Sequence, residues 1–139
     1  MELGVIGLGR MGRIVVNRCL AAGHDVVAFD VDEAAVADAS DAGATPAESI
    51  DDLAAQLGPE RRIWLMVPAG DPVDAALEEL SGTLDGDDIV VDGGNSHFED
   101  SLRRADETVA AYLDCGTSGG PAGAEHGFSL MIGGPEWAY

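Results

Sequence analysis

Three glycines placed directly after an apolar run are the residues in this sequence whose spacing most clearly suits a chemical task. The stretch "GVIGLGRMG" sets Gly7, Gly9 and Gly12 between a predicted strand and a predicted helix. In that context Gly7 allows a tight turn, Gly9 lets the backbone approach a pyrophosphate, and Gly12 lets helix and strand pack closely. The N-terminus of the helix adds free N–H groups and a positive dipole end. The pattern predicts a dinucleotide phosphate site on Gly7, Leu8, Gly9, Arg10, Met11 and Gly12.

An acid at the end of the second apolar run supports this prediction. Asp30 lies eighteen residues beyond Gly12, near the spacing at which a carboxylate binds an adenosine ribose. A plain glycine-rich turn, with Asp30 as a solvated strand end, is the alternative. Arg10 is open at this stage, since it could face a phosphate or solvent.

Two further strand exits carry small or polar residues. "VDGGNSHFED" stops a buried strand at Gly93, Gly94 and Asn95, and a later strand runs into Ser118, Gly119 and Gly120. Ligands of open α/β sheets bind at the carboxyl ends of strands, where glycine permits close backbone approach. The structural alternatives are a left-handed turn residue at Asn95, a helix cap at Ser96 paired with Glu99, and a flexible turn at 118–120.

The elements that must position these residues alternate between strand-like and helical patterns. We expect strands at 3–7, 25–30, 62–67, 87–92, 110–115 and 128–134, and helices at 10–23, from the cap Asp32 through Ala39, from a Thr45-Pro46-Ala47-Glu48 capping box to Gly58, and from Asp71-Pro72 to Gly82. This alternation predicts an α/β fold, a Rossmann-type doubly wound, mostly parallel sheet with helices on both faces. Residues 1–139 are interpreted as one NAD(P)-binding domain.

The charge balance limits the partners. Twenty-six acidic residues face seven basic ones, all arginine, for a formal net charge of −19. Such a surface repels nucleic acid and anionic membranes, and neither a membrane-spanning run nor a secretory signal is evident, so a cytoplasmic protein is expected. A lysine-free acidic surface favours a halophilic source over an ordinary acidic protein. Cys19 and Cys115 lack metal-ligand spacing and are predicted to be small buried residues, with no metal site.

Four motifs, in order, make the pattern specific. "GLGRMG", "MVPAG", "DGGNSHFEDSLRR" and "LDCGTSGGPAGAEHGFSLMIGG" resemble the decarboxylating 6-phosphogluconate dehydrogenases, in particular their shorter bacterial and archaeal branch. The resemblance covers essentially the whole chain. Related 3-hydroxyacid dehydrogenases usually have a Ser-Thr pair where this chain has Asn95-Ser96.

The resemblance implies roles for further residues. Asn95 would lie where the nicotinamide ribose and the sugar acid meet, Ser118, Gly119 and Gly120 would bind 6-phosphogluconate, and Val67, Pro68 and Ala69 would run beside the cofactor. NADP-using relatives often have Asn-Arg-Thr where this chain has Asp30-Val31-Asp32, so NAD is preferred over NADP. The implied reaction is oxidative decarboxylation of 6-phosphogluconate to ribulose 5-phosphate, and the complete enzyme is expected to be a homo-oligomer.

One departure qualifies the resemblance. The family uses a lysine as general base and a glutamate as acid, both on helices that follow the cofactor domain, whereas this sequence contains no lysine. It therefore resembles the cofactor half of an enzyme, predicted to be inactive alone, with His126 the one plausible substitute base. A free-standing dinucleotide-binding or regulatory module, or a related 3-hydroxyacid dehydrogenase, are the alternatives.

Overall fold

A computed structural model describes the backbone of residues 1–139 and every side chain except that of Pro121. Its strands are β1 (Glu2–Ile6), β2 (Asp25–Phe29), β3 (Thr45–Pro46), β4 (Arg62–Leu65), β5 (Ile89–Asp92), β6 (Ala111–Ser118) and β7 (Ser129–Gly133). Its α-helices are α1 (Arg10–Ala21), α2 (Glu33–Asp41), α3 (Ile50–Gln56), α4 (Asp71–Leu80), α5 (Phe98–Glu107) and α6 (Gly123–His126), with 3₁₀ turns η1 (Gly120–Ala122) and η2 (Glu136–Ala138). The predicted α/β class and the six predicted strands are confirmed, and a seventh strand, β3, was not predicted.

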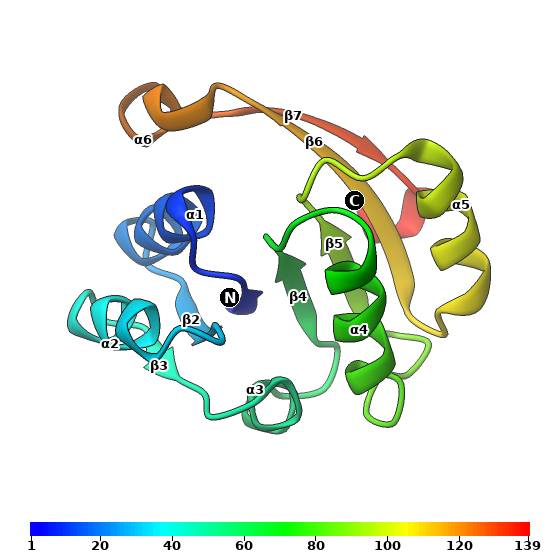
Figure 1. Cartoon of the computed structure of the whole chain (residues 1–139), viewed down its shortest axis with the longest axis horizontal. Coiled ribbons are helices and arrows are strands. Elements are labelled where there is room, and N and C mark those ends of the chain that lie inside the picture. Colours follow the sequence, from blue (N-terminus) through cyan, green and yellow to red (C-terminus); the bar gives the residue numbers. More distant parts are fainter.

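All strands join one sheet in the order β3-β2-β1-β4-β5-β6-β7 (Figure 1). Every pairing is parallel except the last, where β7 returns antiparallel to β6. The chain leaves β1 toward β2 and β3, then crosses back to place β4 on the other side of β1. This reversal between β1 and β4 is the topological switch point at which doubly wound sheets bind ligands.

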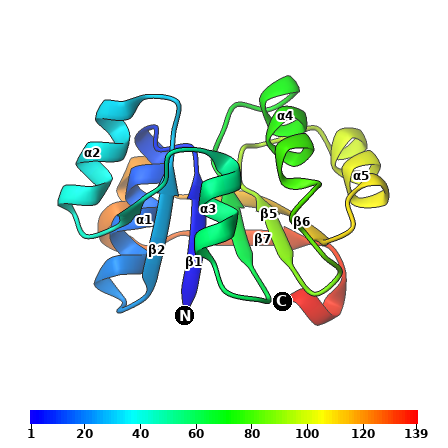
Figure 2. The ribbon, with the colours of Figure 1, turned by 90° about the horizontal axis from the view of Figure 1, so that it is seen from below.

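Helices cover both faces of the sheet, as predicted (Figure 2). Side chains of α1 and α2 pack with Val5, Val26 and Ala28 on one face. On the other, α3 and α4 pack with Ile63, Leu65 and Val90. Because successive strand residues point to opposite faces, the central strands are apolar on both sides, as parallel strands between two helical layers must be.

The start of α3 differs from the prediction. Thr45 and Pro46 form the short edge strand β3, paired with Val27 and Ala28, and do not open a helix. The N-cap is Ser49, whose hydroxyl accepts the N–H of Asp52 at 3.0 Å. A carboxylate oxygen of Asp52 accepts the N–H of Glu48, the residue before the cap, at 2.9 Å, so an arrangement resembling a capping box lies four residues later than expected. Because Thr45 and Pro46 pair with the edge of β2, they are not available to start the helix, and α3 begins after Ser49.

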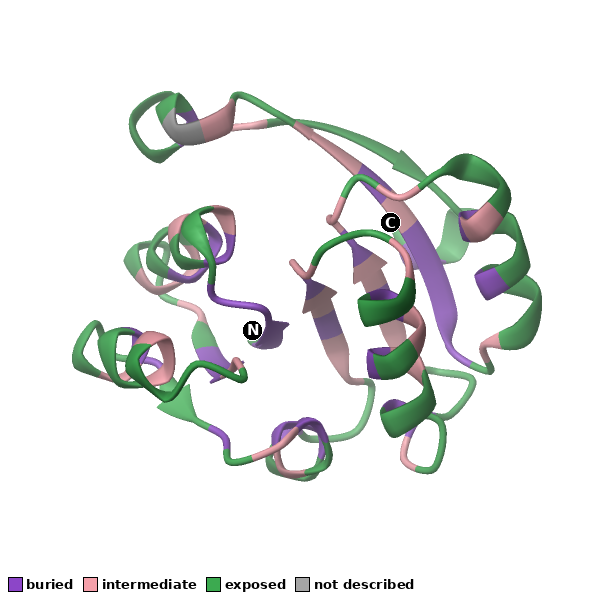
Figure 3. Cartoon of the chain, in the orientation of Figure 1, coloured by how far each residue is buried: buried purple, intermediate pink, exposed green. Residues whose placement is uncertain are grey.

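Burial follows the layers (Figure 3). Cys115 is buried, as predicted, while Cys19 on α1 is only half-buried because it lies at the margin of its core cluster. Desolvation raises the pKa of both thiols, so both stay protonated at neutral pH. All five residues of β7 are exposed.

The described residues were also compared with the requirements of a membrane-spanning helix and of a metal site. None of the described helices has the length and apolar character needed to cross a membrane. Among the described residues, no group of three or more histidine, cysteine, aspartate or glutamate side chains could hold a metal ion.

Candidate functional site

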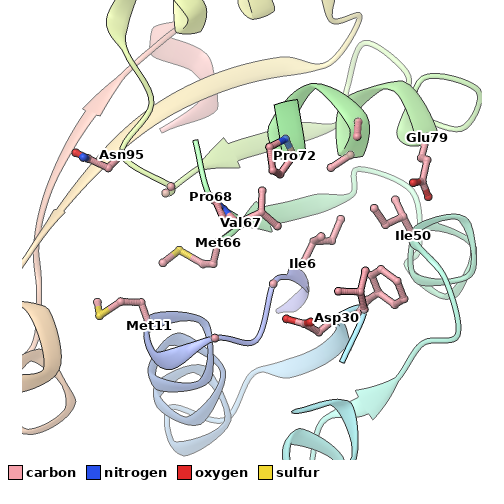
Figure 4. Close-up of a pocket in the computed structure, with 18 of the residues that line it drawn as sticks. Ile6, Met11, Asp30, Ile50, Met66, Val67, Pro68, Pro72, Glu79 and Asn95 are labelled. Carbon is pink, nitrogen blue, oxygen red and sulfur yellow. The ribbon is translucent and has the colours of Figure 1, made fainter. Parts of the chain in front are cut away.

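A cavity of about 800 Å³ opens at the carboxyl ends of the central strands (Figure 4). Its lining comes from the ends of β1 and β2, from the loops that follow β1, β2, β4 and β5, from α1, α3 and α4, and from Thr117 on β6. It is lined by Ile6, Gly7, Gly9, Met11, Phe29, Asp30, Val31, Ile50, Met66, Val67, Pro68, Pro72, Ala75, Ala76, Glu79, Gly93, Gly94, Asn95 and Thr117. The volume lies in the range of small-molecule and cofactor sites.

The three motif glycines have the three environments that the sequence predicted. Gly7 adopts a φ of +95°, which favours glycine, and its N–H donates to the carbonyl of Phe29 at 2.9 Å. A Cβ on Gly12 would lie 1.9 Å from the carbonyl oxygen of Gly7, so only glycine lets α1 approach the loop. A Cβ on Gly9 would have no described atom within 4 Å, because this glycine faces the open cavity.

The first turn of α1 presents free N–H groups beside Gly9. Side chains cap the neighbouring helices, since Asp32 accepts from Ala34 at the start of α2 and Ser49 accepts from Asp52 at the start of α3. The start of α1, whose residues are all described, has Gly9 as its N-cap, no side-chain cap and no acid in the first turn. Unpaired N–H groups and the positive dipole end make this turn suited to an anion.

Asp30 is held at the end of β2. One carboxylate oxygen accepts the N–H of Leu8 at 2.5 Å, and the other accepts the N–H of Asp32 at 2.9 Å. Asp30 therefore fixes the glycine loop and also lines the cavity, so it is not the freely solvated strand end of the alternative interpretation. The Asp32 cap of α2 is confirmed, with its side chain accepting the Ala34 N–H at 3.0 Å.

Asn95 lies at the opposite end of the cavity from Asp30 (Figure 4). Its φ of +63° is left-handed, so the turn interpretation describes its backbone correctly. Asparagine tolerates this conformation better than most residues, and the same turn brings Asn95 to the cavity wall. Val67 and Pro68, on the loop after β4, line the wall between the two ends.

Ser96 is not a helix cap, contrary to that structural alternative. His97 is the N-cap of α5, and its Nδ1 accepts the N–H of Glu99 at 3.4 Å. The hydroxyl of Ser96 instead points inward and donates to Asp92 at 2.6 Å. A buried carboxylate binds a hydroxyl more strongly than a solvated backbone amide does, because charge assists the bond.

The structure brings only part of the expected site to this cavity. Of the residues expected in the site, the lining excludes Leu8, Arg10, Gly12, Ala69, Ser118, Gly119 and Gly120, as far as the described part of the chain shows. Leu8 is in the core, and Arg10 lies in a separate pocket between α1 and α2. Thr117, one residue before the Ser-Gly-Gly segment, does line the cavity. His126 is 80% exposed and pairs with Glu125 on α6.

Sequence reasoning missed the apolar wall opposite the glycine loop. Ile50 from α3 and Pro72, Ala75 and Ala76 from α4 form this wall, with Glu79 at its outer end (Figure 4). The apolar stripe of α4 was a usable signal, since its small side chains recur at helical spacing. Free backbone amides, a carboxylate, an amide side chain and an apolar wall together suit an extended ligand with two different ends and an anionic middle.

Comparisons with known proteins agree with this geometry. Residues 2–139 match the family described as the NAD binding domain of 6-phosphogluconate dehydrogenase. An NAD(+)-dependent, decarboxylating 6-phosphogluconate dehydrogenase from Haloferax volcanii is 73% identical over the whole chain, which covers 46% of that relative. The chain thus spans about half the length of this curated relative.

Solved structures show the same fold. A Plasmodium falciparum 6-phosphogluconate dehydrogenase matches the whole chain with a TM-score of 0.87 and 29% identity, over 32% of its own length. A 3-hydroxyisobutyrate dehydrogenase from Mycobacterium tuberculosis matches 99% of the chain and 47% of its own, with a TM-score of 0.88. At 23% identity, the second likeness extends to the fold alone.

Proposed function

The chain belongs to the family of NAD-binding domains of 6-phosphogluconate dehydrogenase, and on that premise we propose that it is the cofactor-binding part of an NAD-preferring, decarboxylating 6-phosphogluconate dehydrogenase. The observation that carries the proposal is the single cavity wall that runs from Asp30, past the uncapped start of α1, to Asn95. 6-Phosphogluconate is then the small-molecule partner, and the complete protein is proposed to be a homo-oligomer.

The residues of the cavity fit a dinucleotide in three places. The N–H groups of the Gly9–Gly12 turn would hold the pyrophosphate, Asp30 would accept hydrogen bonds from the adenosine ribose, and Asn95 would bind where nicotinamide and substrate meet. Bound NAD supplies the hydride acceptor for oxidation of carbon 3 of the sugar acid. The apolar wall of Ile50, Pro72 and Ala76 excludes water from one side of the cofactor.

The overall reaction proposed for the complete protein has three stages. Hydride leaves carbon 3 of 6-phosphogluconate, the resulting 3-keto acid loses carbon dioxide, and the enediol is protonated to ribulose 5-phosphate. Ser118, Gly119 and Gly120 are proposed to meet the sugar acid beside Thr117, where β6 ends. The high acidity of the surface and the 73% identity to a Haloferax protein support a halophilic source.

NAD is expected to bind more tightly than NADP by roughly tenfold or more, about 1.4 kcal/mol. A 2′-phosphate at the end of β2 would meet the carboxylates of Asp30 and Asp32, and like charges in contact are unfavourable. Asp30→Asn keeps an oxygen for the Leu8 N–H and should narrow the difference. Titration of both dinucleotides into wild type and variant measures it, with Asp25→Asn, at the other end of β2, as the charge-matched control. Tighter binding of NADP than of NAD by the wild type would contradict the proposed preference for NAD.

Asn95→Ala in the complete protein is expected to lower kcat/KM for 6-phosphogluconate by at least about tenfold, a loss of ~1.4 kcal/mol of transition-state stabilisation, with little change in NAD affinity. The physical reason is that the amide is removed where substrate and nicotinamide meet while the glycine loop stays intact. Steady-state kinetics and dinucleotide titration give the two quantities.

A second variant separates this role from the turn. Asn95→Gly removes the same amide but suits the φ of +63°, whereas alanine is strained there. Both variants should lose efficiency if the amide acts on substrate. Full efficiency in the glycine variant would return Asn95 to a purely conformational role.

A further inference from the structure

Arg104 is a buried arginine that joins two loops bordering the cavity. Its side chain is 1% exposed, and Nη2 donates to the carbonyl of Gly70 at 3.0 Å, on the loop after β4. Nη1 donates to the hydroxyl of Ser96 at 2.9 Å, on the loop after β5. Nε donates to Asp74 in α4 at 2.8 Å. One rigid guanidinium therefore ties both loops and α4 to α5.

Asp92 anchors the second loop from below. This carboxylate is fully buried, and one of its oxygens accepts hydrogen bonds from the hydroxyls of Ser96 and Tyr112, each at 2.6 Å. The other oxygen accepts the N–H of Gly94 at 2.9 Å. Nη1 of Arg104 lies 3.6 Å from the shared oxygen, which balances the buried charge. Ser96 thus receives one bond from the arginine and gives one to the acid.

The charge states of this network are stable near neutral pH. The hydrogen bond with Asp74 raises the pKa of Arg104 above its usual range, against the effect of burial. Burial, followed by the bond to Asp92, raises the pKa of Tyr112, so its hydroxyl stays a donor. The hydrogen bond from Arg104 is the largest cause that lowers the pKa of Asp74. The contacts are therefore a fixed scaffold at physiological pH.

The two loops that Arg104 joins carry neighbouring parts of the cavity wall, and a Cβ on Gly94 would lie 2.4 Å from the carbonyl oxygen of Val67. Val67 and Pro68 precede Gly70 on the first loop, and Asn95 precedes Ser96 on the second. Asn95 is held in a left-handed conformation, which persists only where its surroundings fix it. The hydroxyl next to it, on Ser96, is bonded on both sides.

We propose that Arg104 is a positioning residue that acts through Ser96 to hold Asn95 at a fixed distance from the Val67–Pro68 wall. The proposal rests on the proposed function, because Asn95 is there the group that meets substrate. Among the described residues, Arg104 is not part of the cavity lining, and its hydrogen bonds go to Asp74, Ser96 and Gly70, which lie outside the lining.

Ser96→Ala in the complete protein tests the link without leaving a buried arginine or acid wholly unpaired. We expect kcat for 6-phosphogluconate to fall by roughly tenfold, while the affinity for NAD changes less than about twofold, because the phosphate and ribose contacts lie elsewhere. Ser96→Thr retains the hydroxyl and should restore kcat. A purely structural role would lower kcat, NAD affinity and stability together, so a fall in kcat alone identifies the positioning role.

The fluorescence of Trp64 reports on the position of the second loop without depending on turnover. A Cβ on Gly93 would lie 2.4 Å from the indole Nε1 of Trp64, so the indole packs against the start of the second loop. With Trp137→Phe as background, Trp64 is the remaining tryptophan in this sequence. The measurement uses the complete protein, in which any tryptophan outside residues 1–139 is replaced as well, so that Trp64 alone emits. Ser96→Ala should shift the emission of Trp64 and increase its quenching by acrylamide, and Ser96→Thr should not.

Arg103→Ala is the matched control on the same helix. Arg103 bonds Asp74 and Glu107 on the exposed side of α5 and reaches neither loop in the described structure. We expect its kcat and its Trp64 emission to match wild type. Unchanged kcat together with unchanged emission in Ser96→Ala overturns the positioning role. If wild type fails to oxidise 6-phosphogluconate, the proposed function is wrong, and the emission of Trp64 still decides whether Ser96 holds the loop.

Discussion

Gly12→Ala is expected to destabilise the fold by about 3 kcal/mol, at the upper end of the cost of overpacking, and to weaken NAD binding by more than about tenfold. The added Cβ would lie 1.9 Å from the carbonyl oxygen of Gly7. Its neighbour is backbone in a tight turn, so no side-chain rotation relieves the overlap, and α1 must move away from the loop. Denaturant unfolding and NAD titration measure the two effects.

Gly9→Ala provides the comparison that separates packing from binding. A Cβ at Gly9 meets no described atom within 4 Å, and the φ of −59° is accessible to alanine. Stability should stay within about 0.5 kcal/mol of wild type, while NAD affinity falls because the methyl group projects where the pyrophosphate is proposed to lie. Equal NAD affinity in Gly9→Ala and wild type would contradict the proposal that the pyrophosphate binds at this turn.

Residues 1–139 produced alone are expected to bind NAD but to oxidise 6-phosphogluconate about 10²- to 10⁴-fold more slowly than the complete protein, the contribution typical of a positioned general base. All seven basic residues other than histidine are arginines, which do not release a proton at neutral pH. The resemblance assigns the base to a lysine, and this segment contains none.

The histidines do not replace that base. His24 lies beside the N-terminal amine at the amino end of the sheet, His97 caps α5, and His126 is 80% exposed outside the cavity. Absorbance of NADH, after NAD and 6-phosphogluconate are added, measures the rate. Steady turnover that is lost in His126→Ala would show that the segment is self-sufficient.

Local patterns were enough to predict the geometry of the glycine loop and of the strand end beside it. The glycine spacing, the apolar strand before it and the acid at the end of β2 all act within one βαβ unit, where chain connectivity nearly dictates geometry. Asp30 bonds the N–H of Leu8 because parallel pairing of β1 with β2 places their carboxyl ends together. The alternation of strand and helix predicted the fold class for the same reason.

Tertiary competition explains what the sequence did not reveal. Thr45-Pro46 and Ser49 are both good helix starts, and only the free edge of β2 decides between them. Ser96 has the spacing of a cap but finds a stronger partner in Asp92, a choice that depends on Arg104 arriving from α5. The bond from Arg104 to the carbonyl of Gly70 joins residues that lie 34 apart in the sequence, and no local pattern encodes such a contact.

The central position of β1 has a consequence for synthesis on the ribosome. β1 emerges first, yet one of its two sheet partners, β4, begins only at Arg62, well after β2 has ended at Phe29. At about 5–20 residues per second the ribosome needs roughly 2–7 s to deliver that interval. During this time the nascent chain carries an unpaired edge on β1, where neighbouring copies on a crowded polysome could pair incorrectly.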